Sequence, residues 1–314
     1  MYKYLKSEPY FILRVALFSP LLFFINFPFE YNADYVNYYP DYINANFSYE
    51  PIYEWYSYIV REYFGMTFFQ FWLSLSVIEL ILFSLIYRNW LVILISYPSV
   101  IGMSQFFYGT QVRYAIAALI LLYVAIYISR RYLKVFLFLF FSFIHYGGFI
   151  LSGIAILASV VRDGLLIVNK IKSFIMAFIF VSAIFIVQKY LDSIIAYTRF
   201  HYYIDSGKYM EPISTSSFIY ICVSLLLLVL VYSSNCSLRS YEIKLAIIVL
   251  LFSFSTASIA GLSGRISLFY FILEPLVLSR VLLARGSVYL GLCLLAVYMS
   301  RNIFYITSTN FFFY

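Results

Sequence analysis

The sequence predicts an all-α protein, a bundle of membrane-spanning helices. Hydrophobic residues make up 64% of the 314 residues, charged residues make up only 11%, and the mean hydropathy is +0.91. Soluble domains usually carry about 25% charged residues. Apolar runs that approach the length of a membrane span recur along almost the whole chain. We therefore expect a single integral membrane domain over residues 1–314, with about eleven membrane segments.

Each expected segment is an apolar run, and a helix needs about 20 such residues to cross a bilayer. The first run has no small-residue cleavage site after it, so we expect it to remain as a span rather than to act as a signal peptide. The runs are 10–27, 68–87, 90–107, 112–129, 133–146, 147–161, 173–188, 216–232, 244–262, 266–284 and 287–304.

The fifth and sixth runs decide the orientation of the chain. Between Arg131 and Arg162 the chain is too long for one span and too short for two full ones. A hairpin that turns at 145–148 places thirteen Lys and Arg residues on the N-terminal side of the membrane and seven on the other, whereas a single crossing gives eleven and nine. The positive-inside rule favours the hairpin. The N-terminus is then cytoplasmic, and two large loops, 28–67 and 189–215, face outward.

The charge and the cysteines exclude several classes of function. A net charge of +7 is typical of basic cytoplasmic loops in a membrane protein and does not indicate nucleic-acid binding. No two of Cys222, Cys236 and Cys293 have the spacing of metal ligands. We expect no disulfide framework, no metal site and no cofactor.

The second half of the first outer loop has helical periodicity. Pro51 suits the first helical turn, and Glu54 suits the positive end of the helix dipole. The opposite, polar face carries Glu54, Ser57, Arg61 and Glu62. We expect a helix along the outer membrane surface, and the alternative is a helix that only caps the bundle. The apolar stripe consists of Ile52, Trp55, Tyr56, Ile59, Val60, Tyr63 and Phe64.

The same loop is rich in tyrosines and acids. Ten tyrosines lie between Tyr31 and Tyr63, together with six acidic residues over the loop, and the tyrosines before Pro51 do not fit a buried stripe. Anchoring at the membrane interface is one explanation. Sugar binding is the other, because aromatic rings stack on the C–H faces of sugars and carboxylates accept hydrogen bonds from sugar hydroxyls. The tyrosines and acids together favour sugar binding.

Three arginines are expected on the outer face, where each is costly without a partner. Arg113 and Arg265 lie at the outer ends of apolar runs, Arg199 lies in the second outer loop, and His145 lies at the apex of the hairpin. Each arginine alone could extend to lipid headgroups. Together they suggest a site for a lipid phosphate or pyrophosphate, because planar guanidinium groups bind phosphate in a bidentate manner. Glu79 and Glu274, inside predicted spans, are expected to be structural partners of buried donors.

Several motifs occur in the order found in a known family. Asp34-x-x-x-Tyr38 followed by Glu50-Pro51 resembles the first outer loop of EpsG-type polysaccharide polymerases. VRYAIAALILLYVAIYISRR is similar to their Arg-x-x-x-Ala helix, and FSFIHYGGFIL resembles their Phe-His segment, with Ile144 in place of the usual Phe. GRISLFYFILEPLVLSR is similar to their late Arg helix. The resemblance covers about residues 30–280 and extends to other Wzy-type O-antigen polymerases.

The resemblance implies a metal-independent membrane glycosyltransferase with a GT-C-like fold. Such an enzyme transfers a growing glycan from undecaprenyl pyrophosphate to the non-reducing end of a lipid-linked repeat unit, on the outer face of the bacterial inner membrane. Its partners would be the two undecaprenyl-pyrophosphate-linked oligosaccharides, donor and acceptor, and a chain-length regulator protein.

The expected site residues follow from that chemistry. Arg113 and Arg265, with Arg199, would hold the donor pyrophosphate. His145 would bind phosphate or take the proton of the attacking hydroxyl. Asp34 and Glu50 are rival bases, or they orient sugar hydroxyls. The acceptor groove would be lined by Tyr38, Tyr39, Trp55, His201 and Tyr202.

Three other functions fit parts of the sequence. A flippase for the same lipid-linked sugar would need polar residues along the full depth of a pathway, whereas the polar cluster here is concentrated outside. A sugar O-acetyltransferase would need inward-facing catalytic residues, which the sequence lacks. An O-antigen ligase has nearly the same chemistry, with a lipid A core as its acceptor.

Overall fold

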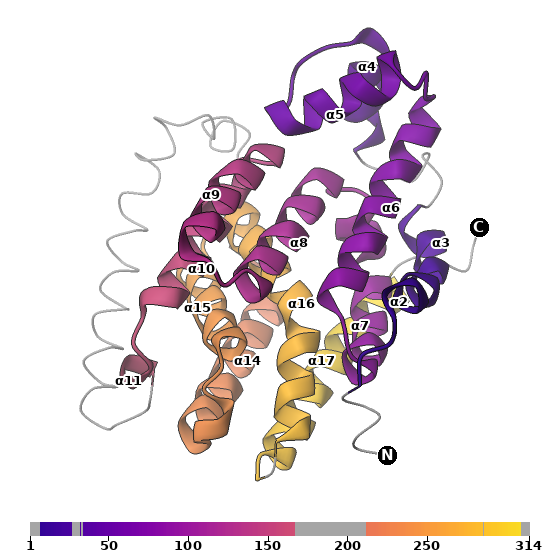
Figure 1. Cartoon of the computed structure of the whole chain (residues 1–314). Helices are drawn as coiled ribbons and strands as arrows, with labels where there is room; N and C mark the ends of the chain where they lie inside the picture. Colours follow the sequence, from indigo (N-terminus) through magenta and orange to yellow (C-terminus); the bar gives the residue numbers. More distant parts are fainter. Residues whose placement is uncertain (1–6, 27–31, 33, 167–211, 285, 309–314) are drawn as a thin grey trace. The chain divides into compact units, whose positions relative to one another are not determined.

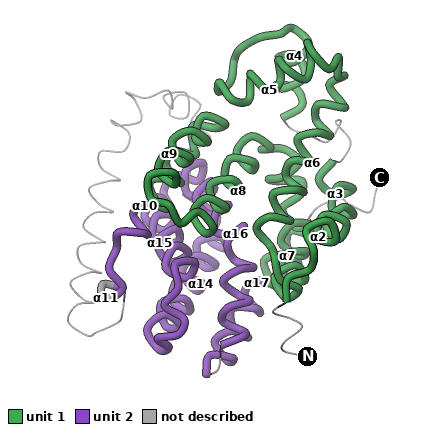
Figure 2. The backbone as a smooth tube through the Cα atoms, in the orientation of Figure 1, with its two compact units in different colours: residues 1–155, 299–314 green, residues 156–298 purple. Residues whose placement is uncertain are grey.

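The computed structural model describes residues 7–26, 32, 34–166, 212–284 and 286–308, and every regular element within them is a helix (Figure 1). The predicted all-α class is therefore confirmed. The chain divides into two compact units, Met1–Ala155 with Met299–Tyr314, and Ile156–Tyr298 (Figure 2). We call them unit 1 and unit 2.

Unit 1 holds most of the expected site residues. Its elements are α2 (Phe11–Phe18), η1 (Ser19–Leu21), α3 (Leu22–Ile25), α4 (Tyr35–Asn44), α5 (Pro51–Glu62), α6 (Phe68–Ile86), α7 (Trp90–Met103), η3 (Ser104–Tyr108), α8 (Val112–Tyr127), α9 (Arg131–Phe141) and η4 (Ser142–Ile144). Unit 2 contains α11 (Asp163–Leu166), α14 (Thr215–Ser234), η5 (Cys236–Leu238), α15 (Tyr241–Ser255) and α16 (Ala260–Leu283). Two helices, α10 (Gly147–Val160) and α17 (Val288–Ser308), contribute residues to both units.

Five helices among the described residues are long and apolar enough to cross a membrane. They are Phe68–Ile86, Trp90–Tyr108, Thr215–Ser234, Ala260–Leu283 and Val288–Ser308. Shorter apolar helices occupy Phe11–Ile25, Val112–Tyr127 and Gly147–Val160. Each falls on a predicted run, whereas the run 173–188 lies outside the described residues. The total of eleven membrane segments and the GT-C-like assignment remain predictions.

The helix breaks where the hairpin was expected. The chain passes from α9 through η4 to His145, whose backbone is extended, and α10 begins at Gly147. A Cβ on Gly147 would lie 3.0 Å from Nδ1 of His145 and 3.1 Å from the ring of Tyr114. Glycine at this position therefore allows the backbone to approach both rings closely.

The core of unit 1 forms where α6 packs against α8. The helix α6 begins with a capping box, in which Thr67 and Gln70 satisfy each other's backbone N–H groups. On α8, Ala115, Ala117 and Ala118 are fully buried, and such small residues allow close helix packing. This packing fixes the start of α8, and with it Arg113, close to the segment that precedes α6.

That segment is the cap, which we define as residues 34–66 with helices α4 and α5. The interpretation that its first tyrosines do not fit a buried stripe is wrong. Tyr38 and Tyr42 on α4 are buried, and their rings lie 5.2 Å from Trp72 and 4.7 Å from Phe71. The sequence obscured this helix because Pro40, a residue that usually ends helices, lies within it.

The predicted second helix of the cap is present as α5, with Pro51 as its first residue and Glu54 in its first turn. Two residues of its polar face, Glu54 and Ser57, are buried, while Trp55 and Ile59 of the apolar stripe are exposed. An outward apolar face suits a membrane surface. The location of this helix at the interface remains a prediction.

Unit 2 is built from α14, α15 and α16. Ser253, Ser263 and Ser267 form a buried hydroxyl cluster between α15 and α16. Glu274 accepts hydrogen bonds from the hydroxyls of Tyr220 and Tyr270, as expected of a structural partner. The same expectation fails for Glu79 in unit 1, whose buried carboxyl oxygens have no hydrogen-bond partner among the described residues.

Candidate functional site

Arg113 forms a buried ion pair with Glu50. Arg113 is the second residue of α8, and Glu50 is the N-cap residue of α5. Its Nη1 contacts Oε2 of Glu50, and its Nε donates to the hydroxyl of Tyr38 at 2.9 Å. The two contacts fasten both helices of the cap to the start of α8.

Three tyrosine rings surround the guanidinium. Its central carbon lies 3.8 Å from the ring centroid of Tyr49, 5.1 Å from that of Tyr38 and 5.3 Å from that of Tyr53. All three rings are within the range of cation–π attraction. We call these four residues together with Glu50 the Arg113 cluster.

The Arg113 cluster extends to the hairpin turn. The backbone N–H of Tyr146 donates to Oε1 of Glu50 at 3.2 Å, so both carboxylate oxygens have partners. Nδ1 of His145 accepts the N–H of Gly147 at 3.0 Å, and the ring of Tyr114 packs edge-on at 5.1 Å. A neutral imidazole that accepts at Nδ1 carries its proton on Nε2. His145 therefore acts as a donor through Nε2.

The tyrosines of the Arg113 cluster stay protonated at neutral pH. Burial raises the pKa of Tyr38 and outweighs the opposing effect of the Arg113 charge, and nearby Asp34 and Glu50 raise this pKa further. Burial likewise raises the pKa of Tyr49 to about 12, and that of Tyr53 well above its ordinary value. Within the described part of the chain, neither the Tyr38 hydroxyl hydrogen nor Nη2 of Arg113 makes a hydrogen bond. Two neighbouring groups can therefore donate to an added anion.

A comparison with family models places the chain. The model described as the EpsG family matches residues 11–314. The chain belongs to the EpsG family. This match confirms the resemblance found in the motifs, and it covers Glu50, Arg113, His145 and Arg265. No curated protein and no solved structure matches the chain.

In this EpsG family member, unit 1 brings four of the expected residues together, namely Tyr38, Glu50, Arg113 and His145. Asp34 immediately precedes α4, and its charge acts on the Tyr38 hydroxyl. The other two expected residues on the cap do not join the cluster. Tyr39 stacks on Tyr35 at 5.0 Å, and Trp55 projects from the exposed face of α5.

The remaining expected residues lie elsewhere. Arg265 belongs to unit 2 and lies in the second turn of α16, rather than at its start. Arg199, His201 and Tyr202 fall outside the described residues. That Arg265 and Arg199 share a site with Arg113 remains a prediction.

Sequence reasoning missed Tyr49, Tyr53 and Tyr146. A signal for two of them was present, since Tyr49 precedes Glu50 directly and Tyr53 follows it by three residues, on the same side of a helix. Tyr146 acts through its backbone N–H, which no side-chain pattern reveals. Among the described residues, no group of three or more His, Cys, Asp or Glu could hold a metal ion.

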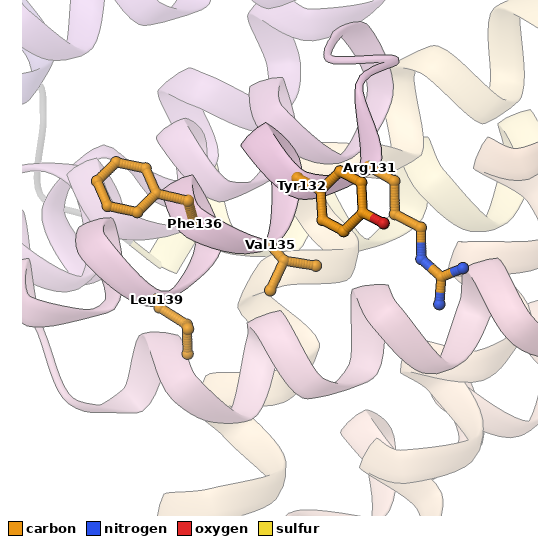
Figure 3. A pocket seen from close by; sticks show the side chains of 5 residues that line it. All are labelled: Arg131, Tyr132, Val135, Phe136 and Leu139. Atoms are coloured by element: carbon orange, nitrogen blue, oxygen red, sulfur yellow. The ribbon is translucent and has the colours of Figure 1, made fainter.

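One surface hollow lies away from the Arg113 cluster, along the exposed side of α9 (Figure 3). Within the described residues it is lined by one helix only, and it contains none of the expected site residues. Its lining residues are Arg131, Tyr132, Val135, Phe136 and Leu139.

Proposed function

We propose that this chain is a surface polysaccharide polymerase of the O-antigen type. It would transfer a growing glycan from undecaprenyl pyrophosphate to the non-reducing end of a lipid-linked repeat unit, on the outer face of the inner membrane. The anomeric C–O bond to pyrophosphate breaks, a glycosidic bond forms to the acceptor hydroxyl, and undecaprenyl pyrophosphate leaves. Membership of the EpsG family supports this assignment, as do the five helices among the described residues that are able to span a membrane.

The observation that carries the proposal is the Arg113 cluster. The guanidinium of Arg113 is buried, and its Nη2 makes no hydrogen bond to any described residue, so together with the O–H of Tyr38 it offers preorganised donors to an anion. Negative charge grows on pyrophosphate as the C–O bond breaks, and donors fixed beforehand stabilise it. By analogy with oxyanion-hole deletions, each donor is worth about 2.7–4 kcal/mol.

The contacts of Glu50 and His145 favour a different role for each residue. Both oxygens of Glu50 are engaged, one by Arg113 and one by the Tyr146 N–H, which favours an orienting role over that of a base. His145 presents a donor at Nε2, which favours phosphate binding over proton removal. Asp34, whose charge raises the pKa of Tyr38, is then the remaining base candidate on the cap.

The other residues of the proposed site do not belong to the Arg113 cluster. Arg265 and Arg199 would be further pyrophosphate ligands. The exposed rings of Tyr39 and Trp55, with His201 and Tyr202, would contact acceptor sugars. The donor and acceptor would both be undecaprenyl-pyrophosphate-linked oligosaccharides, and a chain-length regulator protein would be a partner.

Deletion of the gene in its host, followed by gel analysis of the surface polysaccharide, tests this function. A single repeat unit on the lipid core, with the ladder of longer chains lost, is the expected result. Unsubstituted core with polymer accumulating on undecaprenyl pyrophosphate would indicate a ligase. An unchanged ladder would contradict both the polymerase and the ligase assignments and would favour the transporter hypothesis.

A further inference from the structure

Glu54 is a buried carboxylate that the proposed mechanism does not use. It lies in the first turn of α5 and is only 4% exposed. Its Oε1 accepts the backbone N–H of Tyr49 at 2.8 Å. Glu54 therefore folds back over the chain that leads into its own helix.

That segment is otherwise held at few points. Between α4 and α5, Ala45 adopts the left-handed conformation with φ of 55°, and the N–H of Asn46 bonds to the carbonyl of Asp41. From Phe47 to Tyr49 the chain has no helix of its own. The hydrogen bond from the Tyr49 N–H to Glu54 thus fixes the backbone at the end of the segment.

The residue fixed in this way carries the ring closest to the guanidinium of Arg113. The Tyr49 centroid lies 3.8 Å from the guanidinium carbon. The rings of Tyr38, at 5.3 Å, and Tyr53, at 5.7 Å, support it from both sides. A continuous set of contacts therefore leads from Glu54 through Tyr49 to Arg113.

We propose that Tyr49 and Glu54 are positioning residues, which hold the Arg113 guanidinium in the orientation that binds a pyrophosphate group. This inference rests on the proposed function. Tyr49 acts through the face of its ring, and Glu54 acts as a hydrogen-bond acceptor for a backbone N–H group, so its negative charge is not required.

Conservative variants separate these roles from simple structural ones. Glu54→Gln keeps an acceptor oxygen, and Tyr49→Phe keeps the ring, so both should behave like the wild type. Glu54→Leu removes the acceptor, and Tyr49→Leu removes the ring. Matched controls on the same helix are Glu62→Gln and Tyr58→Leu, because these side chains project from the exposed side of α5.

The probe is farnesyl pyrophosphate, a short polyprenyl pyrophosphate, titrated into the full chain in lipid nanodiscs. We expect Glu54→Leu and Tyr49→Leu to weaken binding about tenfold, the order expected for loss of one desolvated cation–π contact. Glu54→Gln, Tyr49→Phe and both controls should stay within about twofold of the wild type. Melting temperatures are recorded for every variant. If the melting temperature of Glu54→Leu falls well below that of the wild type, its binding result is set aside. The farnesyl pyrophosphate affinity of Tyr49→Leu is then compared with those of Tyr49→Phe and Glu54→Gln, and this comparison tests the positioning role.

The outcomes distinguish the two proposals. No binding by the wild type, or equal binding by Arg113→Ala, would overturn the pyrophosphate site and the positioning role together. Binding that Arg113→Ala abolishes, but that Tyr49→Leu and Glu54→Leu leave unchanged, would overturn the positioning role alone. So would a Glu54→Gln variant as weak as Glu54→Leu, since charge would then be essential.

Discussion

Among the described residues, two arginine–glutamate pairs join helices, one in each unit. In unit 1, the side chains of Arg113 and Glu50 are 13% and 9% exposed. In unit 2, Arg280 in the last turn of α16 pairs with Glu242 in the first turn of α15, and the arginine side chain is 49% exposed. Arg113 has a tyrosine hydroxyl and three rings around it, whereas no ring contact to Arg280 occurs within the described residues.

This comparison shows that burial and aromatic contacts, rather than the presence of an ion pair, distinguish Arg113 as a candidate functional residue. Arg280 and Glu242 each lie at the helix end that favours their charge, and water solvates the arginine. Arg113 has lost most of its water, so its charge must be compensated by protein groups. The desolvation free energy of Arg113 is offset by these contacts, which hold a positive charge in a fixed position. The Arg280–Glu242 pair should therefore matter less to stability and activity than the Arg113–Glu50 pair.

The largest effect is expected from Arg113→Ala, which leaves Glu50 buried without its counter-charge. Breaking a buried pair in this way costs about 3–5 kcal/mol. The melting temperature should fall, and polymer should disappear from cells that carry the variant. Thermal unfolding of the purified protein and a polysaccharide gel measure the two effects.

The double variant Arg113→Ala/Glu50→Ala provides the control. Removing both charges should recover much of the lost stability, because no unpaired charge remains buried, but it should not restore polymer. A double variant that regains both stability and polymer would mean that Arg113 only holds the cap in place.

Gly147→Ala should have the next largest effect. The added Cβ would lie 3.0–3.2 Å from the rings of His145 and Tyr114, so the hairpin turn next to Glu50 must shift. Overpacking of this kind costs about 1–3 kcal/mol. In the same helix, Gly153→Ala meets nothing within 4 Å and should be neutral or slightly stabilising. Equal melting temperatures for the two variants would contradict the close packing of the turn.

Arg280→Ala should have a small effect. Because the arginine is half exposed, the pair contributes less than about 1 kcal/mol. Polymer length and yield should match those of the wild type on the same gel. Loss of polymer with Arg280→Ala would remove the contrast between the two pairs.

The smallest expected effect concerns pH. Burial raises the pKa of Glu54 above its ordinary value, so folding favours its protonated form. The resulting stabilisation is complete below about pH 4.3 and is lost as the pH rises through the raised pKa. Glu54→Gln cannot ionise, so its melting temperature should gain on that of the wild type as the pH rises towards 7. A gap that is constant with pH would show that folding does not perturb this carboxyl.

Much of the fold was predictable from the sequence, because a membrane helix is recorded in a local run of apolar residues. The hairpin break at His145 was predictable for the same reason, since Gly147 and Gly148 interrupt such a run. Helix α4 was not, because its buried residues are mostly tyrosines and Pro40 lies within the helix. The burial of Glu54 on α5 depends on its hydrogen bond from the Tyr49 N–H, which an apolar pattern does not encode.

The candidate site was predictable in part. Arg113, Glu50 and His145 were expected near one another because all three fall at helix ends on the same predicted side. The rings of Tyr49 and Tyr53 were not predicted beside Arg113, although their positions close to Glu50 along the chain provided a signal. Glu79 shows a further limit, since neither its burial nor its lack of partners among the described residues follows from its place in an apolar run.

The most direct test is synthesis of a single linkage by the purified protein in nanodiscs. The substrate is undecaprenyl pyrophosphate carrying one repeat unit from the host, and the products are separated by mass. Wild type and Arg280→Ala should both form a lipid-linked dimer of repeat units and release undecaprenyl pyrophosphate, whereas Arg113→Ala should form neither. Dimer formation by Arg113→Ala at the wild-type rate would contradict the assignment of the Arg113 cluster as the catalytic site.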